Sequence, residues 1–456
     1  ELLKRAVYYL LKNKNGWPRF CNDKTLAEGY MRNNGIDKKT ARERIAVGCN
    51  WMCVPGKEFP MNDTVKINVA KVLCEALSDM KEMKEKSTEK LFALYEEHRV
   101  KAIDVTAQGI NLHLDHAWEV TPELVMNLMM KNTLERGEDI SQCAELYTVG
   151  IDGAGLAVVA DSFGALQTRV EEEKILTWEE LYEALENNFA DERTRLIMNS
   201  SPKYCHGGTV SDAWAKRLTE SWVCCIKAQK MPKGRQLLPG WFSWSRTIEY
   251  GSKVGATPNG RRAGEPISHG ANPNPHFRTD GAVTAQSNGI ASVQCGYGNT
   301  APLQLEFDPK LAADEKGVEI VLNLIETHFR RGGTLININV LDAEKLMDMC
   351  CLLPLQPKSR ADECHDQPAG DDRTNLPGDI RARCMHEQEV ARILVAAHLV
   401  DDAGRHRERG NARRTDHRVD LVLAEQVEEF GEKYAADCVK DEGDEAQRED
   451  EQRLPA

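Results

Sequence analysis

The sequence has no stretch of about 18 consecutive apolar residues, the length that a membrane-spanning helix needs. It also has no run of basic residues interleaved with aromatic residues, and its formal net charge at pH 7 is -13. Proteins that attract nucleic acids usually present a basic patch. We therefore expect this protein to bind neither a membrane nor a nucleic acid.

Cysteine is plentiful, but a disulfide framework is missing. The 14 cysteines are scattered without regular spacing, and the first residues do not have the composition of a secretory leader. This usage fits the reducing cytoplasm, where we expect the protein to be found. The length allows about two to four domains. Because an amphipathic pattern starts at residue 2, we also expect the chain to be part of a longer protein.

Complete metal and nucleotide motifs are also missing. Cys49 and Cys53 have no histidine at a zinc-ligand spacing, and Gly56 stands where a radical-initiating iron–sulfur enzyme would have its third cysteine. A glycine-rich turn in residues 151–160 contains Gly153 and Gly155, but it lacks the third glycine of a dinucleotide loop and has no strong strand pattern before it. We expect no bound metal and no nucleotide.

Lysine disappears near the end of the chain. Residues 360–432 contain no lysine and 11 arginines, and Phe430 and Tyr434 are the only aromatic residues after residue 353. Such a composition is typical of a solvated or disordered tail. The abrupt change also suggests translation in a shifted reading frame, the interpretation that we favour. We therefore divide the chain into residues 1–353 and a charged, arginine-rich tail, residues 354–456.

The feature most suggestive of chemistry is a cysteine placed directly after a strand pattern. Ile45 and Val47 favour a short buried strand, Gly48 permits close backbone approach, and a Pro-Gly turn at residues 55–56 closes the loop before the next helix. The sulfur of Cys49 is therefore our candidate reactive atom. The alternative is that Cys49 is only a small core residue. A Cys–His nucleophile pair also stays open, with His206, His269 or His276 as base.

The remaining patterns alternate between strand, helix and loop, which predicts an α/β protein. We expect long loops over residues 231–309 and a strand at 334–340 with clean alternation. Asn62 and Asp63 are expected to cap a helix, and Cys224 and Cys225 to be core residues within one. Helices are predicted at residues 1–12, 81–100, 121–133, 178–190, 211–230 and 310–331, and after the turn at 151–160.

Six segments, in order along residues 1–350, resemble the glycyl radical enzymes, the superfamily of pyruvate formate-lyase and glycerol dehydratase. The most specific is the Gly-Ala-Thr-Pro-Asn-Gly-Arg segment that starts at Gly255. The resemblance rests on Gly48-Cys49 before the Pro-Gly turn and on residues 159–162, 199–204, 254–266, 302–309 and 332–340.

The resemblance implies a ten-stranded α/β barrel, of which this chain would supply the C-terminal half. It implies that Cys49 is the catalytic thiyl residue, buried at the barrel mouth and facing the loop of residues 295–305, with Gly48, Asn50 and Trp51 at the substrate. It also implies a protein-derived glycyl radical as cofactor, a radical S-adenosylmethionine activating enzyme as partner, a small-molecule substrate, and a homodimer at full length.

Three departures from the family pattern matter. Asn50 stands where pyruvate formate-lyases have a second cysteine, and Trp51 stands where the dehydratases have a glutamate base; an indole cannot accept a proton. We therefore expect a substrate that is not a diol, with Trp51, Trp241 and Trp244 as candidates for an aromatic wall, although a structural role fits the last two better. The C-terminal radical glycine motif is missing, so we expect the chain as written to hold no glycyl radical and to be inactive alone. An inactive scaffold or partner fragment is the other alternative.

Overall fold

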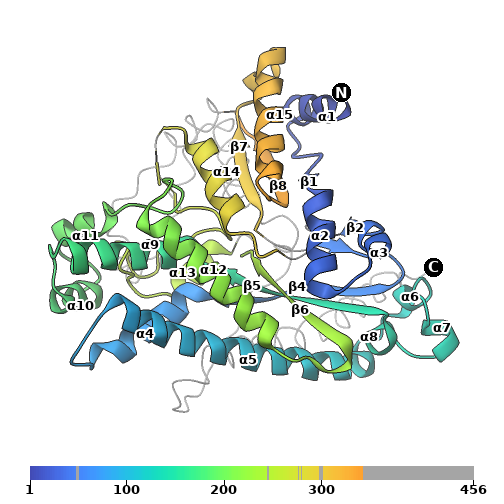
Figure 1. The fold of residues 1–456 in the computed structure, drawn as a ribbon, viewed down its shortest axis with the longest axis horizontal. Coiled ribbons are helices and arrows are strands. Elements are labelled where there is room, and N and C mark those ends of the chain that lie inside the picture. The colour runs from blue at the N-terminus through green and yellow to red at the C-terminus, as the bar shows by residue number, and fades with distance from the viewer. Residues whose placement is uncertain (48–50, 244–245, 276, 279, 297–300, 343–456) are drawn as a thin grey trace, which may run out of the picture.

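The structure is a computed structural model that describes residues 1–47, 51–243, 246–275, 277–278, 280–296 and 301–342, without the side chains of residues 62–64. Helices and strands alternate along the chain (Figure 1). The strands are β1 (Phe20–Cys21), β2 (Ile45–Val47), β3 (Trp51–Cys53), β4 (Glu58–Asn68), β5 (Leu146–Ala154), β6 (Arg235–Trp241), β7 (Leu303–Phe307) and β8 (Leu335–Val340). The helices are α1 (Leu2–Asn13), α2 (Asp23–Asn34), α3 (Lys38–Arg42), α4 (Val69–Lys81), α5 (Thr88–Val120), α6 (Leu124–Asn127), α7 (Thr133–Arg136), α8 (Ile140–Cys143), α9 (Leu156–Ala165), α10 (Trp178–Glu186), α11 (Glu192–Asn199), α12 (Val210–Ala228), α13 (Thr247–Ser252), α14 (Ala282–Ser292) and α15 (Glu315–Arg330), with short π or 3-10 turns η1 (Leu166–Glu172), η2 (Pro232–Gly234) and η3 (Pro309–Ala312).

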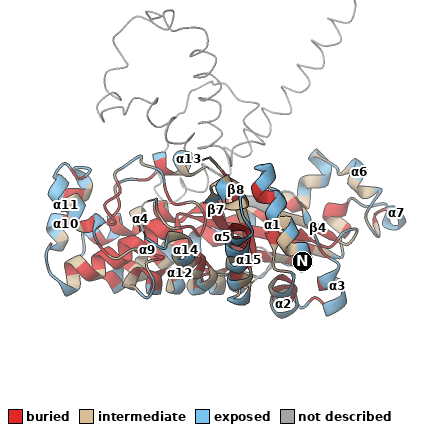
Figure 2. Cartoon of the chain, turned by 90° about the horizontal axis from the view of Figure 1, so that it is seen from above, coloured by how far each residue is buried: buried red, intermediate tan, exposed pale blue. Residues whose placement is uncertain are grey.

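The central sheet has the order β4-β5-β6, and both of its strand pairs are parallel. Side chains alternate between its two faces. The outer face carries Val149, Ile151 and Trp241, and helices α5 and α12 supply its polar and aromatic partners. Figure 2 shows the buried residues concentrated in this layer and the exposed ones at the ends of the molecule. The apolar outer face therefore forms the main core.

The inner face of the same sheet is partly polar. Lys66 lies beside Asp152 on the neighbouring strand, and Glu58 accepts a hydrogen bond from Thr148. These four residues are all buried. A mixed face of this kind differs from a purely structural parallel sheet, whose strands are usually apolar on both sides.

A second sheet has the order β1-β8-β7, in which β7 and β8 are parallel and β1 is antiparallel to β8. Ile336 and Ile338 on one face belong to the same core as residues Val318, Val321 and Ile325 of α15. The predicted α/β class is therefore confirmed. Within the described residues, parallel pairing involves three strands of the first sheet and two of the second.

The strand before Cys49 differs from the prediction. Ile45–Val47 does form a strand, but it is the outer arm of an antiparallel hairpin with β3, and Ile45 is 51% exposed. The buried arm is β3, whose three residues are all buried. The expectation of a short buried strand at Ile45 was therefore wrong, because β-branched residues favour strands whether or not they are buried.

The helix predicted to begin at Asn62 and Asp63 was also wrong in its start. Residues 58–68 form β4, and the helix begins only at Val69, capped by Asn68, whose side chain accepts a hydrogen bond from the Lys71 N–H. The Pro-Gly turn thus leads into a strand.

Smaller corrections concern other helices. Residues 121–133 contain only the four-residue helix α6 and the first residue of α7, whereas α5 runs 20 residues beyond the predicted end, to Val120. Cys224 is exposed and Cys225 half-buried, so the pair is not a core feature. The predictions of α1, α10, α12, α15 and β8 are confirmed to within a few residues. The arginine-rich tail, residues 354–456, lies outside the described residues, and its boundary stays a prediction.

His328 on α15 predicts a measurable pH dependence of stability. The ring is fully buried and its Nδ1 atom lies 3.2 Å from the Ser287 carbonyl oxygen. Burial lowers the pKa of His328 to about 4, although the Ser287 carbonyl opposes this shift. Because the folded pKa lies below the unfolded value, the neutral ring contributes stability above pH 6.5, and that contribution is lost as pH falls toward 4.

Between pH 7 and pH 5 we expect this histidine alone to lower the free energy of unfolding by about 2 kcal/mol. Urea unfolding at both pH values should show the loss in the native sequence and a smaller loss in His328→Gln. The matched control His116→Gln, at an exposed ring, should keep the native difference. An equal pH difference in His328→Gln would contradict the assignment.

Candidate active site

Of the site residues predicted from the sequence, one lies within the described region and the others lie outside it. Gly48, Cys49 and Asn50 lie outside it, and so do residues 297–300, so the predicted approach of Cys49 to the 295–305 loop stays a prediction. Trp51 is described and is the first residue of β3, with 6% of its surface exposed. Trp51 therefore gives the location of the segment that directly follows Cys49.

An aromatic cluster surrounds Trp51. The ring of Phe242 meets the Trp51 ring edge-on at a centroid distance of 5.0 Å. The Phe242 ring also contacts the His269 ring, at a centroid distance of 6.1 Å. Phe242 follows β6 and continues its inner face, since Gly240 points inward and Trp241 outward. The indole N–H of Trp51 is buried and has no hydrogen-bond partner within the described residues. It is a donor available to a bound molecule.

The other predicted aromatic residues do not join this cluster. Trp241 lies on the outer face, stacked on Trp222 of α12 at 5.3 Å, and its indole N–H donates to Thr219. Trp241 therefore has a structural role, as the sequence analysis favoured over a place in the aromatic wall. Trp244 lies outside the described residues. The aromatic partner of Trp51 is therefore Phe242.

A buried ion pair lies on the same inner face. Lys66 Nζ is 3.1 Å from Asp152 Oδ2, and only 3% and 1% of the two side chains are exposed. Lys66 Nζ also lies 5.5 Å from the centre of the Phe242 ring. Sequence analysis missed this pair, because residues 65–68 were assigned to a helix. The alternation of Val65 and Ile67 with Lys66 and Asn68 was the signal that could have found it.

Burial also raises the pKa values of two groups at the β2-β3 hairpin, the Glu58 carboxyl and the Cys53 thiol. The Glu58 carboxyl is buried and accepts the Val54 N–H at 2.7 Å, yet burial raises its pKa above the ordinary range. Burial likewise raises the pKa of Cys53 to about 11, with the Glu58 charge adding to the effect. Cys53 is therefore a protonated thiol at neutral pH and a poor nucleophile.

The structure does not test the Cys–His alternative, because its thiol, Cys49, lies outside the described residues. His206 contacts the backbone carbonyl of Phe277 through Nε2, and its Nδ1 accepts the Lys203 N–H, so both ring nitrogens are engaged with backbone. His276 lies outside the described region. Every described thiol with a resolved shift has a raised pKa, which disfavours the thiolate: Cys21, Cys53, Cys74, Cys143, Cys205, Cys225 and Cys295.

Three of the resembling segments pack against each other. The buried Asp161 accepts hydrogen bonds from the Tyr204 N–H and from Asn274, each at 2.7 Å. The Asn259 N–H donates to Ser162. The Arg261 guanidinium donates to backbone carbonyls of its own loop, including Gly255 at 2.7 Å. These contacts join residues 159–162, 199–204 and 254–266 into one packed scaffold. Packing therefore explains why these segments resemble the family pattern.

The glycine-rich turn at residues 151–160 is explained by packing. Contrary to the sequence analysis, the strand β5 does precede it. A side chain at Gly153 would lie 2.2 Å from the Trp241 ring, and Gly155 begins α9 at φ +97° against Ala70 and Ile267. The first turn of α9 is buried, and its Ala157 N–H donates to Ser268. The Trp241 ring on the neighbouring strand accounts for Gly153, and the tight turn into α9 accounts for Gly155.

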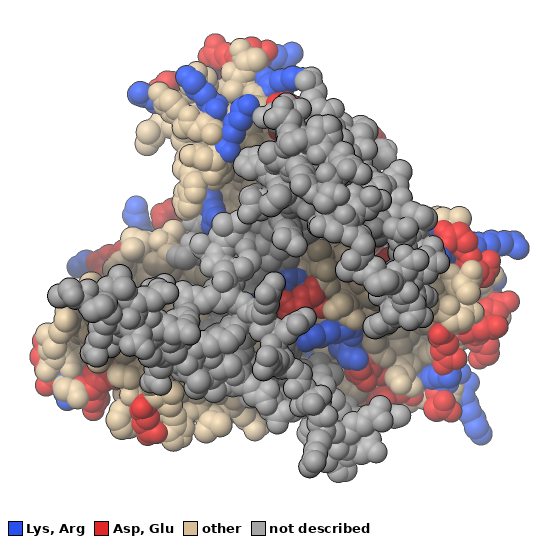
Figure 3. Space-filling model, turned by 180° about the vertical axis from the view of Figure 1, so that it is seen from behind, with Lys and Arg blue, Asp and Glu red and all other residues tan. Residues whose placement is uncertain are grey.

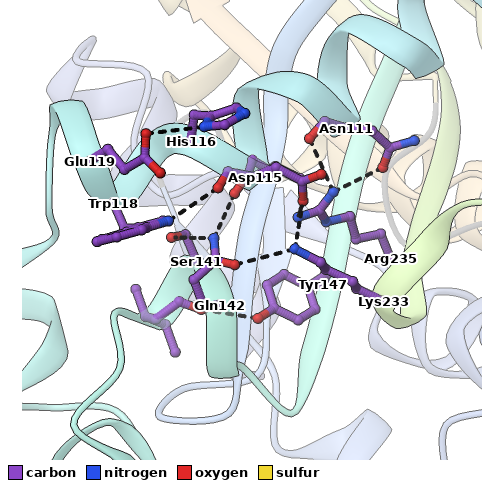
Figure 4. Close-up of polar contacts among 12 residues, drawn as sticks. Asn111, Asp115, His116, Trp118, Glu119, Ser141, Gln142, Tyr147, Lys233 and Arg235 are labelled. Atoms are coloured by element: carbon purple, nitrogen blue, oxygen red, sulfur yellow. Dashed lines mark hydrogen bonds and ion pairs between the residues drawn. The ribbon is translucent and has the colours of Figure 1, made fainter.

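A polar network lies where α5, α8 and the start of β6 meet (Figure 4). The buried Arg235 donates to Asn111 and to Asp115 Oδ1, and Lys233 also reaches Asp115. A nearby cavity of about 180 Å³ is lined by residues that include Phe59, His113 and Asp139. The Asp139 carboxylate is already bonded by the backbone of Glu123 and Ser141 and by Asn127. The polar network therefore holds α5, α8 and the start of β6 together.

The described residues include neither a membrane-spanning helix nor a cluster of metal-ligand side chains. None of their helices is long and apolar enough to cross a membrane. They contain no group of three or more His, Cys, Asp or Glu side chains placed to hold a metal ion. On the face seen in Figure 3, acidic and basic side chains are interspersed where the surface belongs to described residues.

Comparison with known proteins identifies relatives of the chain. It is 23% identical over 367 residues to a (2S)-3-sulfopropanediol dehydratase of Klebsiella oxytoca, which covers 75% of this chain and 44% of that protein. It is 24% identical over 298 residues to the 4-hydroxyphenylacetate decarboxylase glycyl radical subunit of Clostridioides difficile, covering 57% and 32%. A solved structure described for 1,2-propanediol dehydration in Roseburia inulinivorans matches with a TM-score of 0.72 and 25% identity, over 77% of this chain and 46% of that one.

The chain thus spans less than half the length of these relatives. A sequence model described as pyruvate formate lyase-like matches residues 1–251, more than half of the chain. This segment includes β2, β3 and the parallel strands β4, β5 and β6. The chain therefore belongs to the pyruvate formate lyase-like family, within the glycyl radical enzyme superfamily.

Proposed function

We propose that this chain is the cysteine-loop part of a glycyl radical enzyme and that Cys49 removes hydrogen from a small organic substrate. The observation that carries the proposal is the family match over residues 1–251, which contains Cys49 two residues before the buried Trp51. Gly48, Asn50 and Trp51 would contact the substrate. A radical S-adenosylmethionine activating enzyme would be the partner, in a cytoplasmic protein that is a homodimer at full length.

A glycyl radical would supply the unpaired electron: the Cys49 S–H bond breaks as a glycine C–H bond forms. The Cys49 sulfur radical would then take hydrogen from a substrate C–H bond, which re-forms the S–H bond. That S–H bond would break again when hydrogen passes to the product radical, and the regenerated sulfur radical would take hydrogen back from the glycine. The chain's own contribution is to exclude water, since all three residues of β3 are buried. This sequence contains no counterpart of the family motif that carries the radical glycine.

The tryptophan at position 51 limits the class of reaction that the enzyme can catalyse. The relatives are named for dehydration and for decarboxylation. Elimination of water needs a nearby proton acceptor, and the indole at position 51 can only donate. Cleavage or formation of a carbon–carbon or carbon–heteroatom bond without this base is the reaction class that fits the residue. Diols are therefore poor candidate substrates.

The test uses the coding sequence that surrounds this chain in its source DNA. The extended protein is treated anaerobically with an activating enzyme, a reductant and S-adenosylmethionine, and its electron paramagnetic resonance spectrum is recorded. We expect a doublet split by one α-hydrogen, traced to glycine by labelling, and no rapid turnover of glycerol or 1,2-propanediol. A protein that gives no radical under these conditions would be an inactive scaffold, and rapid diol turnover would contradict the role given to Trp51.

A further inference from the structure

The buried arm of the hairpin, β3, has a strand on one side only. Among the described residues β3 pairs with β2 alone, and the register joins Val47 to Trp51. All three residues of β3 are nevertheless buried. Buried backbone N–H and C=O groups need hydrogen-bond partners, so the edge of β3 that faces away from β2 must find its partners outside the hairpin.

Two buried side chains supply partners along β3. The hydroxyl of Tyr30, on α2, donates to the Met52 carbonyl at 2.7 Å. The carboxylate of Glu58, at the start of β4, accepts the Val54 N–H at 2.7 Å. Tyr30 is fully buried and Glu58 is 2% exposed. The two side chains therefore hold the backbone immediately before and immediately after Cys53.

Both of these side chains are themselves held in place. The Arg44 guanidinium lies 5.6 Å from the centre of the Tyr30 ring and donates to the Asp23 carbonyl at 2.7 Å. Thr148, on β5, donates to Glu58. Burial raises the pKa of Tyr30 well above its ordinary value, so the hydroxyl keeps the proton that it donates. Tyr30 thus joins β3 to α2, and Glu58 joins it to the central sheet.

The hairpin also packs on a small core of its own. Met52 belongs to a cluster that is separate from the main core and contains Leu26, Ala27, Tyr30, Ile36 and Ala41. Residues 48–50 connect the paired Val47 and Trp51, and Cys49 is the middle residue of this connection. Two residues of chain span at most about 7 Å, so the two arms limit where the Cys49 sulfur can lie.

Building on the proposed function, we infer that Tyr30 and Glu58 are positioning residues for the reactive cysteine. They hold the backbone of β3 and act on Cys49 through it. Hydrogen transfer needs its donor and acceptor atoms nearly in contact, and a misplacement of about 1 Å can cost about 100-fold in rate. Loss of either hydrogen bond should therefore loosen the hairpin and slow hydrogen transfer at Cys49.

Amide hydrogen exchange of the purified full chain, measured by mass spectrometry, tests the hold on the hairpin. Tyr30→Phe removes only the hydroxyl, and we expect peptides that cover β3 to exchange about 10-fold faster than in the native chain. Tyr182→Phe is the matched control, because the buried Tyr182 hydroxyl donates to the Leu77 carbonyl at 2.9 Å and joins α10 to α4. These helices lie on the opposite side of the molecule from β2 (Figure 1), so β3 should keep its native exchange rate.

Deuterium uptake by the glycyl radical of the extended, activated protein tests the consequence at Cys49 without any substrate. In heavy water the radical glycine takes deuterium from the Cys49 S–D bond. The sulfur radical that is left takes the α-hydrogen of that glycine, so the doublet collapses to a singlet, whereas Cys49→Ser should keep the doublet.

We expect Tyr30→Phe and Glu58→Leu each to slow this collapse about 10-fold. Glu58→Gln keeps an oxygen that can accept the Val54 N–H, so its collapse should stay near the native rate. Tyr182→Phe should also collapse at the native rate.

Native amide exchange of β3 in Tyr30→Phe, or native collapse in both Tyr30→Phe and Glu58→Leu, would overturn the inference. Equal slowing in Tyr182→Phe would overturn it too, because loss of any buried hydrogen bond would then explain the effect. Equal slowing by Glu58→Gln and Glu58→Leu would contradict the role given to the Glu58 hydrogen bond. Failure of the proposed function would differ from all of these, as a native extended protein that gives no radical. The amide exchange of the full chain would then still decide whether Tyr30 holds the hairpin.

Discussion

Replacing Cys49 by serine should abolish substrate turnover by the extended, activated enzyme while leaving its glycyl radical signal intact. The S–H bond is weak enough to exchange hydrogen with a glycine C–H bond at small cost, whereas the O–H bond of serine is much stronger. Serine therefore cannot pass the radical to substrate, although it fills nearly the same space. Loss of a residue that bears the reacting atom typically costs at least about 1,000-fold in rate.

Cys53→Ser is the matched control in the same hairpin. Cys53 is buried, and burial together with the Glu58 charge raises its pKa to about 11, so its thiol stays protonated. This variant should keep both the radical signal and most of the turnover. Turnover by Cys49→Ser at the native rate would show that another atom removes hydrogen from the substrate. Loss of the radical signal in Cys49→Ser would show that the cysteine is needed for activation instead.

Periodic patterns in the sequence were enough to place the helices that cover the core. In α15, Val318, Val321 and Ile325 recur at helical spacing and are all buried, so the stripe that predicts the helix is the face that packs. Gly332, at φ +97°, follows its end as expected. Such agreement arises where one local preference and one tertiary environment favour the same structure.

The chain between residues 58 and 69 shows where this reasoning fails. Val65 and Val69 lie four residues apart and so read as one helical face, but Val65 belongs to β4 and Val69 begins α4. What decides the outcome is pairing with β5, about 85 residues later in the chain, which no local pattern reports. The Asn68 cap then sets the start of the helix.

The candidate site was predictable in part for the same reason. Trp51 was found because it lies two residues after Cys49 in the sequence. The Lys66–Asp152 pair joins residues 86 positions apart, and Phe242, which follows β6 of the central sheet, meets Trp51 of the separate β2-β3 hairpin only through tertiary packing. Partners of this kind are fixed by strand order, whereas their residue types alone are compatible with many surfaces. The resemblance to the glycyl radical enzymes named the cysteine but gave no account of these contacts.

Gly153→Ala should strongly destabilise the fold, because the glycine is required by packing. Its added Cβ would lie 2.2 Å and 2.5 Å from two carbons of the Trp241 ring. That ring is held by stacking on Trp222 and by its hydrogen bond to Thr219, so it has little freedom to move. We expect the free energy of unfolding, measured in urea, to fall by about 3 kcal/mol, the upper range for overpacking a core.

A double-mutant cycle separates this clash from other effects of the alanine. Trp241→Leu removes the ring atoms that the new methyl group would meet, so Gly153→Ala should cost much less in that background and the two changes should be strongly non-additive. Gly35→Ala is the control for backbone strain alone, since φ is +67° there and no atom lies within 4 Å of the added Cβ; its expected cost is about 1 kcal/mol. If the Gly153-x-Gly155 turn instead served a phosphate, Gly153→Ala would leave the unfolding free energy unchanged and weaken only nucleotide binding. Additive effects of Gly153→Ala and Trp241→Leu would therefore contradict the packing explanation, because two side chains that compete for one volume must couple.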